Sequence, residues 1–156
     1  VTPPDTLARL RSEGVVFEFP SATPRPYSLW GGAEASIWFD RNGGMEPSNP
    51  EATASVLASV SQLEALIDDA MARHGLPAEK IALGGFSMGG GISLQVMARA
   101  KHCLGAVFAL SSYLCDDSAA YKEFSAGKAE RKARSAPRSR NPAVSSLRST
   151  AQLLVE

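Results

Sequence analysis

The stretch "KIALGGFSMGGG", residues 80–91, decides the fold. It joins a short apolar run to five glycines and one serine, Ser87. A P-loop would need Lys and Ser or Thr after its last glycine, yet an isoleucine follows Gly91, and no register of the dinucleotide-binding pattern G-x-G-x-x-G fits. The remaining interpretation is the pattern G-x-S-x-G, from Gly85 to Gly89, at a turn between a strand and a helix.

This turn has the residues that a nucleophilic serine requires. The hydroxyl of Ser87 must project from a tight, strained turn so that a base and a substrate can both reach it. We expect glycine at 85 and 89 because side chains there would collide across the turn. The backbone N–H of Met88, at the start of a helix, would face a developing oxyanion. The alternative is a glycine-rich helix start with an incidental serine.

The segments around this turn alternate between strand and helix patterns. Short apolar runs predict strands at 15–19, 80–85 and 104–110, and an apolar stripe repeating every three or four residues predicts a helix over 51–75. Another helix is expected over 87–102. The last two strand runs are continuously apolar, which is typical of strands covered by helices on both faces. The fold class is therefore α/β, with a parallel sheet and right-handed crossovers.

The segment over residues 20–50 is unusually long for a connection. It contains five prolines, four glycines and both tryptophans, Trp30 and Trp38. Connections of this length inside a compact domain are more often functional than idle.

The charge changes sign near Tyr121. Residues 1–121 carry 8 basic and 13 acidic side chains, whereas residues 122–156 carry 8 basic and 3 acidic ones. The second segment is rich in Ser, Arg, Ala and Pro and has few large apolar residues to bury. We therefore divide the chain into a domain over 1–121 and a tail over 122–156, expected to be disordered or to hold one short helix near 144–155.

Composition excludes several other classes. The net charge is zero, which gives no electrostatic reason to expect binding to nucleic acid. The two cysteines, Cys103 and Cys115, match neither a metal-binding spacing nor a disulfide framework. No window is apolar enough for a membrane span, and the first residues do not resemble a signal peptide. We therefore expect a cytoplasmic protein.

Three blocks carry a family resemblance: "PSATPRPYSLWGGAEASIWFDR" (20–41), "KIALGGFSMGGGISLQVMAR" (80–99) and "LGAVFALSSYL" (104–114). Together they resemble the phospholipase/carboxylesterase family of α/β-hydrolases, which includes acyl-protein thioesterases and lysophospholipase-like proteins. The resemblance runs from about 15 to about 121. It implies an α/β-hydrolase fold and a Ser-Asp-His hydrolase of small acyl esters or acylated proteins, without metal or cofactor.

The resemblance also implies roles for individual residues. Ser87 matches the nucleophile, and Met88 matches the elbow residue whose backbone N–H lines the oxyanion hole. Acyl-protein thioesterases usually have Gln where this chain has Met88, which favours the lysophospholipase-like branch. The segment Trp38-Phe39-Asp40 matches a loop near the active-site mouth, although plain packing is an equal alternative.

Other parts of the family pattern are missing. The His-Gly-x-Gly-Asp turn that supplies a second oxyanion donor does not occur. The chain has two histidines, His74 and His102, which we expect at helix ends away from Ser87. Asp116 and Asp117 follow the strand after the nucleophile strand, whereas this family takes its acid from the next strand.

We therefore expect a chain truncated at both ends and inactive as written, because its serine has no base. The alternatives are a non-catalytic hydrolase-like binding module and a protein whose basic tail binds RNA or an acidic membrane.

Overall fold

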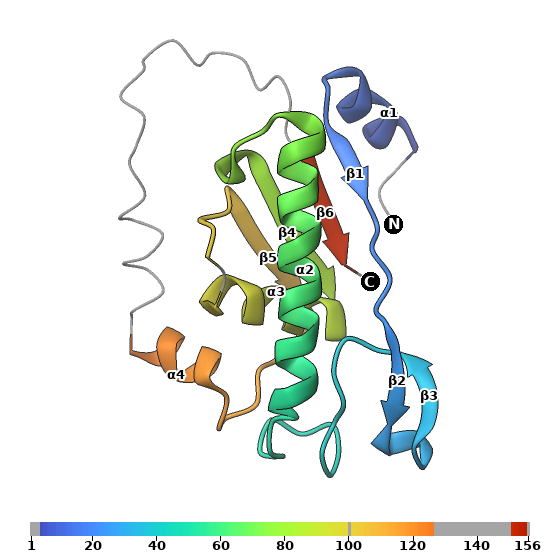
Figure 1. The fold of residues 1–156 in the computed structure, drawn as a ribbon, viewed down its shortest axis with the longest axis vertical. Coiled ribbons are helices and arrows are strands. Elements are labelled where there is room, and N and C mark those ends of the chain that lie inside the picture. The colour runs from blue at the N-terminus through green and yellow to red at the C-terminus, as the bar shows by residue number, and fades with distance from the viewer. Residues whose placement is uncertain (1–3, 100, 127–150, 156) are drawn as a thin grey trace.

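The computed structural model describes residues 4–99, 101–126 and 151–155 (Figure 1). Its centre is a parallel sheet with the strand order β1, β6, β4, β5. The strands are β1 (Val16–Glu18), β4 (Ile81–Phe86), β5 (Ala106–Leu110) and β6 (Ala151–Val155). The α/β class and the parallel sheet expected from the sequence are confirmed.

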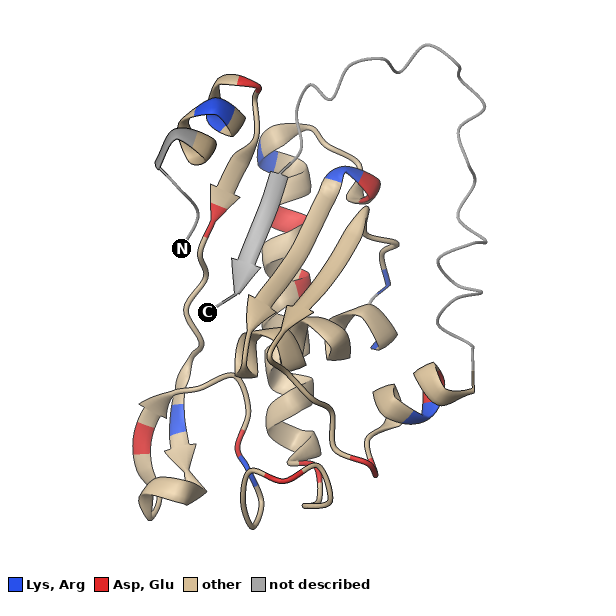
Figure 2. Cartoon of the chain, turned by 180° about the vertical axis from the view of Figure 1, so that it is seen from behind, with Lys and Arg blue, Asp and Glu red and all other residues tan. Residues whose placement is uncertain are grey.

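Two helices pack against one face of this sheet: α2 (Thr53–His74) and α3 (Met88–Arg99). From behind, β4 and β5 lie in front of both helices, and no helix of the described residues covers their other face (Figure 2). The expectation that helices cover both faces is therefore wrong for the described part of the chain. A continuous apolar run shows that a strand is apolar, but it does not show which helices pack against that strand.

The core lies between α2, α3 and the sheet. The apolar stripe expected on α2 is confirmed, because Val56, Val60, Leu63 and Ile67 are all buried and Met71 packs against the core. The helix ends where Gly75 adopts a left-handed conformation, with φ of +60°, and donates its N–H to the Met71 carbonyl. Tertiary packing of this stripe, rather than a capped start, holds α2 in place.

The connection over 20–50 contains a hairpin that the sequence did not predict. Strands β2 (Pro24–Tyr27) and β3 (Ala33–Ser36) form an antiparallel hairpin around the 3-10 turn η1 (Ser28–Trp30). An isolated backbone bridge between Arg41 and Glu51 then closes a loop. Strand β2 contains two prolines and β3 has the sequence AEAS, so neither shows the apolar pattern that identifies a strand in a sequence, and the hairpin was missed.

Three short elements complete the described structure: α1 (Pro4–Ser12) before β1, the 3-10 turn η2 (Ala78–Lys80) between α2 and β4, and α4 (Ala119–Ser125) after β5. The side chain of Ser118 caps α4 by accepting the N–H of Tyr121 at 3.0 Å. Helix α4 thus runs across the domain boundary expected between 121 and 122.

The short helix expected near 144–155 is wrong for residues 151–155, which form β6. This strand takes a place between β1 and β4, where parallel backbone hydrogen bonds on both sides satisfy it. Residues 127–150, expected to be disordered, lie outside the described residues.

Candidate active site

Ser87 lies between the end of β4 and the start of α3, and its backbone is strained. Its φ is +51°, an uncommon value for a residue with a side chain. The Ser87 N–H donates to the Leu110 carbonyl at 2.9 Å, and the Ser87 carbonyl accepts the Gly91 N–H at 3.1 Å. Such strain persists only where the surrounding contacts enforce it.

The end of β5 supplies that enforcement. The hydroxyl of Ser112 donates to the Ser87 carbonyl at 2.7 Å and contacts the Leu110 carbonyl at 3.0 Å. Ser111, just before it, also has a φ of +51°. The chain therefore bends sharply after β5, and the hydrogen bond from Ser112 at this bend stabilises the Ser87 turn.

The glycines after Ser87 permit this close approach. A Cβ on Gly90 would overlap the Ser112 hydroxyl and lie 2.8 Å from the Gly85 carbonyl oxygen. A Cβ on Gly91 would come within 3.3 Å of both the Phe39 ring and the Tyr113 carbonyl. The sequence pattern pointed to Gly85 and Gly89, which are both buried, but did not identify these two contacts.

The residues Trp38, Phe39 and Asp40 lie in different surroundings. Trp38 is 2% exposed and belongs to the core, as the packing alternative proposed. Phe39 lies against α3 at Gly91, one turn beyond Ser87. Met88, the first residue of α3, also packs against the core through its side chain.

Asp40 is held by three hydrogen bonds rather than left free for a substrate. Its carboxylate accepts the backbone N–H groups of Ser28 and Arg41, both at 2.8 Å, and the Ser28 hydroxyl. Partial burial acts to raise the pKa of Asp40, but these hydrogen bonds outweigh it and hold the pKa below its ordinary value. Asp40 thus fixes the hairpin to the loop that follows it.

Both histidines pair with acids on other elements. His74, the last residue of α2, lies 3.3 Å from the Glu18 carboxylate at the end of β1. His102 lies 2.7 Å from the Asp68 carboxylate on α2. The 12 residues of α3 separate His102 from Ser87, a length of about 18 Å.

The two candidate acids, Asp116 and Asp117, form hydrogen bonds with a neighbouring loop. The Asp117 carboxylate accepts the Glu51 N–H at 3.1 Å, and the Asp116 N–H donates to the Pro47 carbonyl at 2.9 Å. Both contacts tie the segment after β5 to the loop closed by Arg41 and Glu51.

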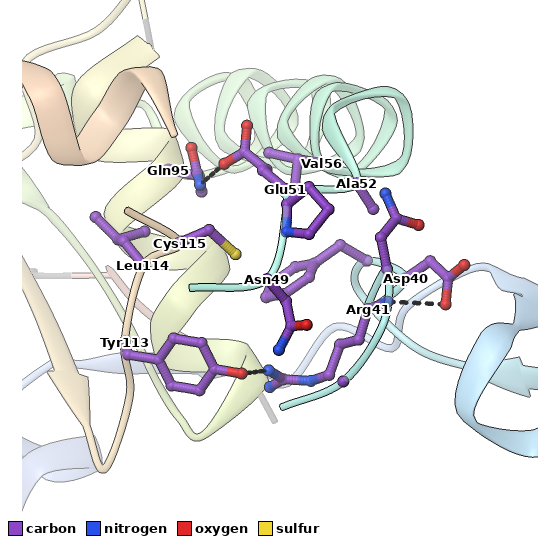
Figure 3. Close-up of a pocket in the computed structure, with 14 residues that line it drawn as sticks. Asp40, Arg41, Asn49, Glu51, Ala52, Val56, Gln95, Tyr113, Leu114 and Cys115 are labelled. Carbon is purple, nitrogen blue, oxygen red and sulfur yellow. Dashed lines mark hydrogen bonds between the residues drawn. The ribbon is translucent and has the colours of Figure 1, made fainter. Parts of the chain in front are cut away.

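A pocket lies between this loop, the start of α2 and the segment after β5 (Figure 3). Its lining includes Phe39, Arg41, Asn49, Tyr113 and Cys115, whereas Ser87 is not part of it. Burial raises the pKa of the Cys115 thiol, so the thiolate that a nucleophilic or metal-binding cysteine needs is disfavoured. In the part of the chain that the structure describes, no group of three His, Cys, Asp or Glu residues is placed to hold a metal ion.

Comparison with known proteins identifies the family of this chain. Residues 7–129 match the phospholipase/carboxylesterase family. The chain belongs to this family. The match extends beyond residue 121, where the resemblance in the sequence was expected to end.

Two curated proteins are similar in sequence to this chain. Lysophospholipase-like protein 1 of Mus musculus is 32% identical over 109 residues, which are 70% of this chain and 45% of the relative. Acyl-protein thioesterase 1 of Debaryomyces hansenii is 35% identical over 104 residues, 65% of this chain and 44% of the relative. The chain thus spans less than half the length of these relatives.

Solved structures show the same fold. Arabidopsis thaliana SOBER1 has a TM-score of 0.60 at 21% identity, covering 87% of this chain and 70% of that one. Zea mays acyl-protein thioesterase 2 has a TM-score of 0.52 at 25% identity, covering 76% of this chain and 49% of that one. The α/β-hydrolase fold expected from the sequence is confirmed by these comparisons.

Sequence reasoning missed two groups near the candidate site. In the sequence, Ser112 lies within the apolar block 104–114, and Arg41 is the last residue of the block 20–41. Neither has a signal in the sequence, because the role of each depends on a partner 25 or 72 residues away.

Proposed function

We propose that this chain carries the nucleophile of a carboxylic ester or thioester hydrolase, and that Ser87 is that nucleophile. The observation that supports this most directly is the φ of +51° at Ser87 between β4 and α3. In a nucleophile elbow this geometry presents the hydroxyl at the carboxyl end of the strand.

The proposed reaction is acyl transfer followed by hydrolysis. The Ser87 oxygen attacks the acyl carbon and loses its proton to a base, and the bond to the leaving alcohol or thiol breaks as that group takes up a proton. Water then releases the acid and restores the serine. The N–H of Met88 would donate to the oxyanion, with Gly85 and Gly89 allowing the turn.

The proposed substrates are small acyl esters or acylated proteins, by analogy with the names of the two relatives. We also propose that the protein is cytoplasmic, as expected from the sequence. No described helix is long and apolar enough to cross a membrane.

No histidine is placed to act as the general base for Ser87 in the described residues. The imidazoles of His74 and His102 pair with Glu18 and Asp68, and neither is hydrogen-bonded to Ser87. An unactivated serine is a poor nucleophile. We therefore propose that Ser87 in this chain reacts slowly.

Labelling with a fluorophosphonate probe tests the proposal. We expect slow labelling that Ser87→Ala abolishes. Ser111→Ala is the matched control, because Ser111 has the same φ at the end of a parallel strand but no helix after it, and this variant should label like the wild type.

Two outcomes would contradict the proposal. Labelling at a rate typical of intact serine hydrolases would show that a base reaches Ser87. Labelling that persists in Ser87→Ala would exclude Ser87 as the nucleophile, and a complete absence of labelling in the wild type would contradict the proposed slow reaction.

A further inference from the structure

Arg41 is buried against aromatic rings and not paired with an acid. The residue is 8% exposed, and none of the ion pairs within the described residues includes it. Its Nη1 atom donates to the phenolic oxygen of Tyr113, a contact drawn in Figure 3. The guanidinium carbon lies 5.0 Å from the centre of the Tyr113 ring and 5.6 Å from that of Phe39. A guanidinium at such distances is attracted to both rings, so Arg41 holds them together.

Tyr113 connects Arg41 to the candidate nucleophile. Tyr113 directly follows Ser112 in the chain, and the Ser112 hydroxyl donates to the Ser87 carbonyl at 2.7 Å. Consecutive residues are joined by a planar peptide unit, so a fixed Tyr113 restricts the positions that Ser112 can take. The contact between Arg41 and Tyr113 therefore limits the movement of the Ser112 hydroxyl.

Phe39 connects Arg41 to the start of α3. A Cβ on Gly91 would lie 3.3 Å from the end of the Phe39 ring and 3.3 Å from the Tyr113 carbonyl oxygen. The Gly91 N–H donates to the Ser87 carbonyl at 3.1 Å. Among the described residues, the Ser112 hydroxyl and the Gly91 N–H are the two donors to this carbonyl. Both donors lie next to groups that Arg41 contacts.

The loop that carries Arg41 has a fixed backbone. A backbone bridge joins Arg41 to Glu51. The segment after β5 adds two hydrogen bonds to this loop, from the Asp116 N–H to the Pro47 carbonyl and from the Glu51 N–H to the Asp117 carboxylate. Arg41 therefore reaches Tyr113 and Phe39 from a backbone that is held in place.

We propose that Arg41 is a positioning residue for the Ser87 turn, acting through Tyr113 and Phe39 on the two donors that hold the Ser87 carbonyl. Arg41 is not a catalytic residue, because it forms no hydrogen bond with Ser87. The inference rests on the proposed function of Ser87 as a nucleophile. A displacement of about 1 Å can cost on the order of a hundred-fold in rate, so a small shift of this turn is enough to slow the reaction.

Saturation kinetics of fluorophosphonate labelling measure the effect on Ser87. Arg41→Met removes the charge and the hydrogen bond but keeps an unbranched side chain. We expect it to lower the limiting labelling rate by about ten-fold and to leave the half-saturating probe concentration unchanged, because the probe still binds but meets a displaced hydroxyl. Arg73→Met is the matched control. It changes a half-exposed arginine that pairs with Glu18 and Asp69, and it should label like the wild type.

A double-mutant cycle separates positioning from a general loss of stability. All variants are labelled at a temperature at which they are folded. Because Arg41 acts on Ser112 through Tyr113, Arg41→Met should slow labelling less in the Ser112→Ala background than in the wild type. Losses that multiply would show that Arg41 and Ser112 act independently, and an unchanged limiting rate in Arg41→Met would show that Arg41 has no effect on Ser87. Either result would overturn the proposal.

Hydrogen exchange of the Gly91 amide tests the geometry without any reaction. Its acceptor is the Ser87 carbonyl, so the exchange rate reports whether the turn is held. Arg41→Met should speed exchange at Gly91 more than at Val96, a buried residue further along α3. This result supports the role of Arg41 even where the wild type does not label, which would contradict only the reaction proposed for Ser87. Equal changes at Gly91 and Val96 would overturn the proposal.

Tyr113→Phe is the second variant, in case Arg41→Met does not fold. It keeps the ring and removes only the hydroxyl that accepts from Arg41. Its limiting labelling rate should fall by less than that of Arg41→Met, and the Gly91 amide should again exchange faster. Labelling and exchange like those of the wild type in Tyr113→Phe would count against the proposal.

Discussion

The two faces of the β4–β5 pair have similar apolar residues but different surroundings. Leu83 faces the helices and is fully buried, whereas Leu110, on the opposite face of the neighbouring strand, is 57% exposed. Phe86, on the same face as Leu110, is 63% exposed. The difference shows that burial comes from α2 and α3 and not from the strands themselves, since both strands are apolar throughout.

The largest expected effect separates the two leucines. Leu83→Ala leaves a cavity under the helices and should lower the free energy of unfolding by about 2–5 kcal/mol. Leu110→Ala removes a mostly exposed side chain and should change it by less than about 0.5 kcal/mol. Urea unfolding of both variants measures the two values. Equal losses would mean that something covers the second face in solution.

A pair of glycines sharpens the same comparison. Gly90→Ala places a Cβ against the Ser112 hydroxyl and the Gly85 carbonyl, and should cost about 1–3 kcal/mol of unfolding free energy. Gly84→Ala meets the end of the Phe108 ring on the uncovered face, and that ring can swing outward. We expect a smaller loss there. A larger loss for Gly84→Ala, measured by thermal unfolding, would contradict this order.

The hydroxyl of Ser112 joins the end of β5 to the backbone of the candidate nucleophile, Ser87. Ser112→Ala removes its bonds to the Ser87 and Leu110 carbonyls and should destabilise the fold by about 1 kcal/mol. It should also slow fluorophosphonate labelling, because the strained turn loses its clamp. Ser111→Ala, a change at the exposed neighbour, is the control and should leave both measurements unchanged. Labelling as fast as in the wild type would mean that Ser112 does not position Ser87.

The smallest effect concerns pH. The pKa of Asp40 is lower in the folded chain than in the unfolded one, so its stabilising contribution is present above about pH 4 and is lost as the pH falls through the folded pKa. Asp40→Asn should remove this part of the acid sensitivity. Glu34→Gln, a change on the exposed part of β3, should retain it. Unfolding midpoints measured from pH 6 to pH 2 would decide, and identical profiles for wild type and Asp40→Asn would contradict the role of Asp40.

The sequence predicted the elements that carry a strong periodic pattern. The stripe on α2, the stop at Gly75 and the strand–turn–helix around Ser87 all follow from local spacing, and each is present. The hairpin of β2 and β3 was missed because β2 contains two prolines and β3, with the sequence AEAS, has no large apolar residue. Strand β6 was expected as a helix, because a short apolar run does not reveal whether neighbouring strands leave a place for it.

By itself, the sequence determined the class of fold and the position of the serine turn, because glycine spacing and apolar period are local properties of the chain. The family followed from the resemblance of three sequence blocks. The tertiary structure decided what surrounds that serine. Only the folded chain brings the Ser112 hydroxyl to the Ser87 carbonyl and surrounds the Asp40 carboxylate with hydrogen-bond donors. It also buries Arg41 beside Tyr113. These contacts join residues far apart in the chain, and their energies depend on distance and burial, which no local pattern encodes.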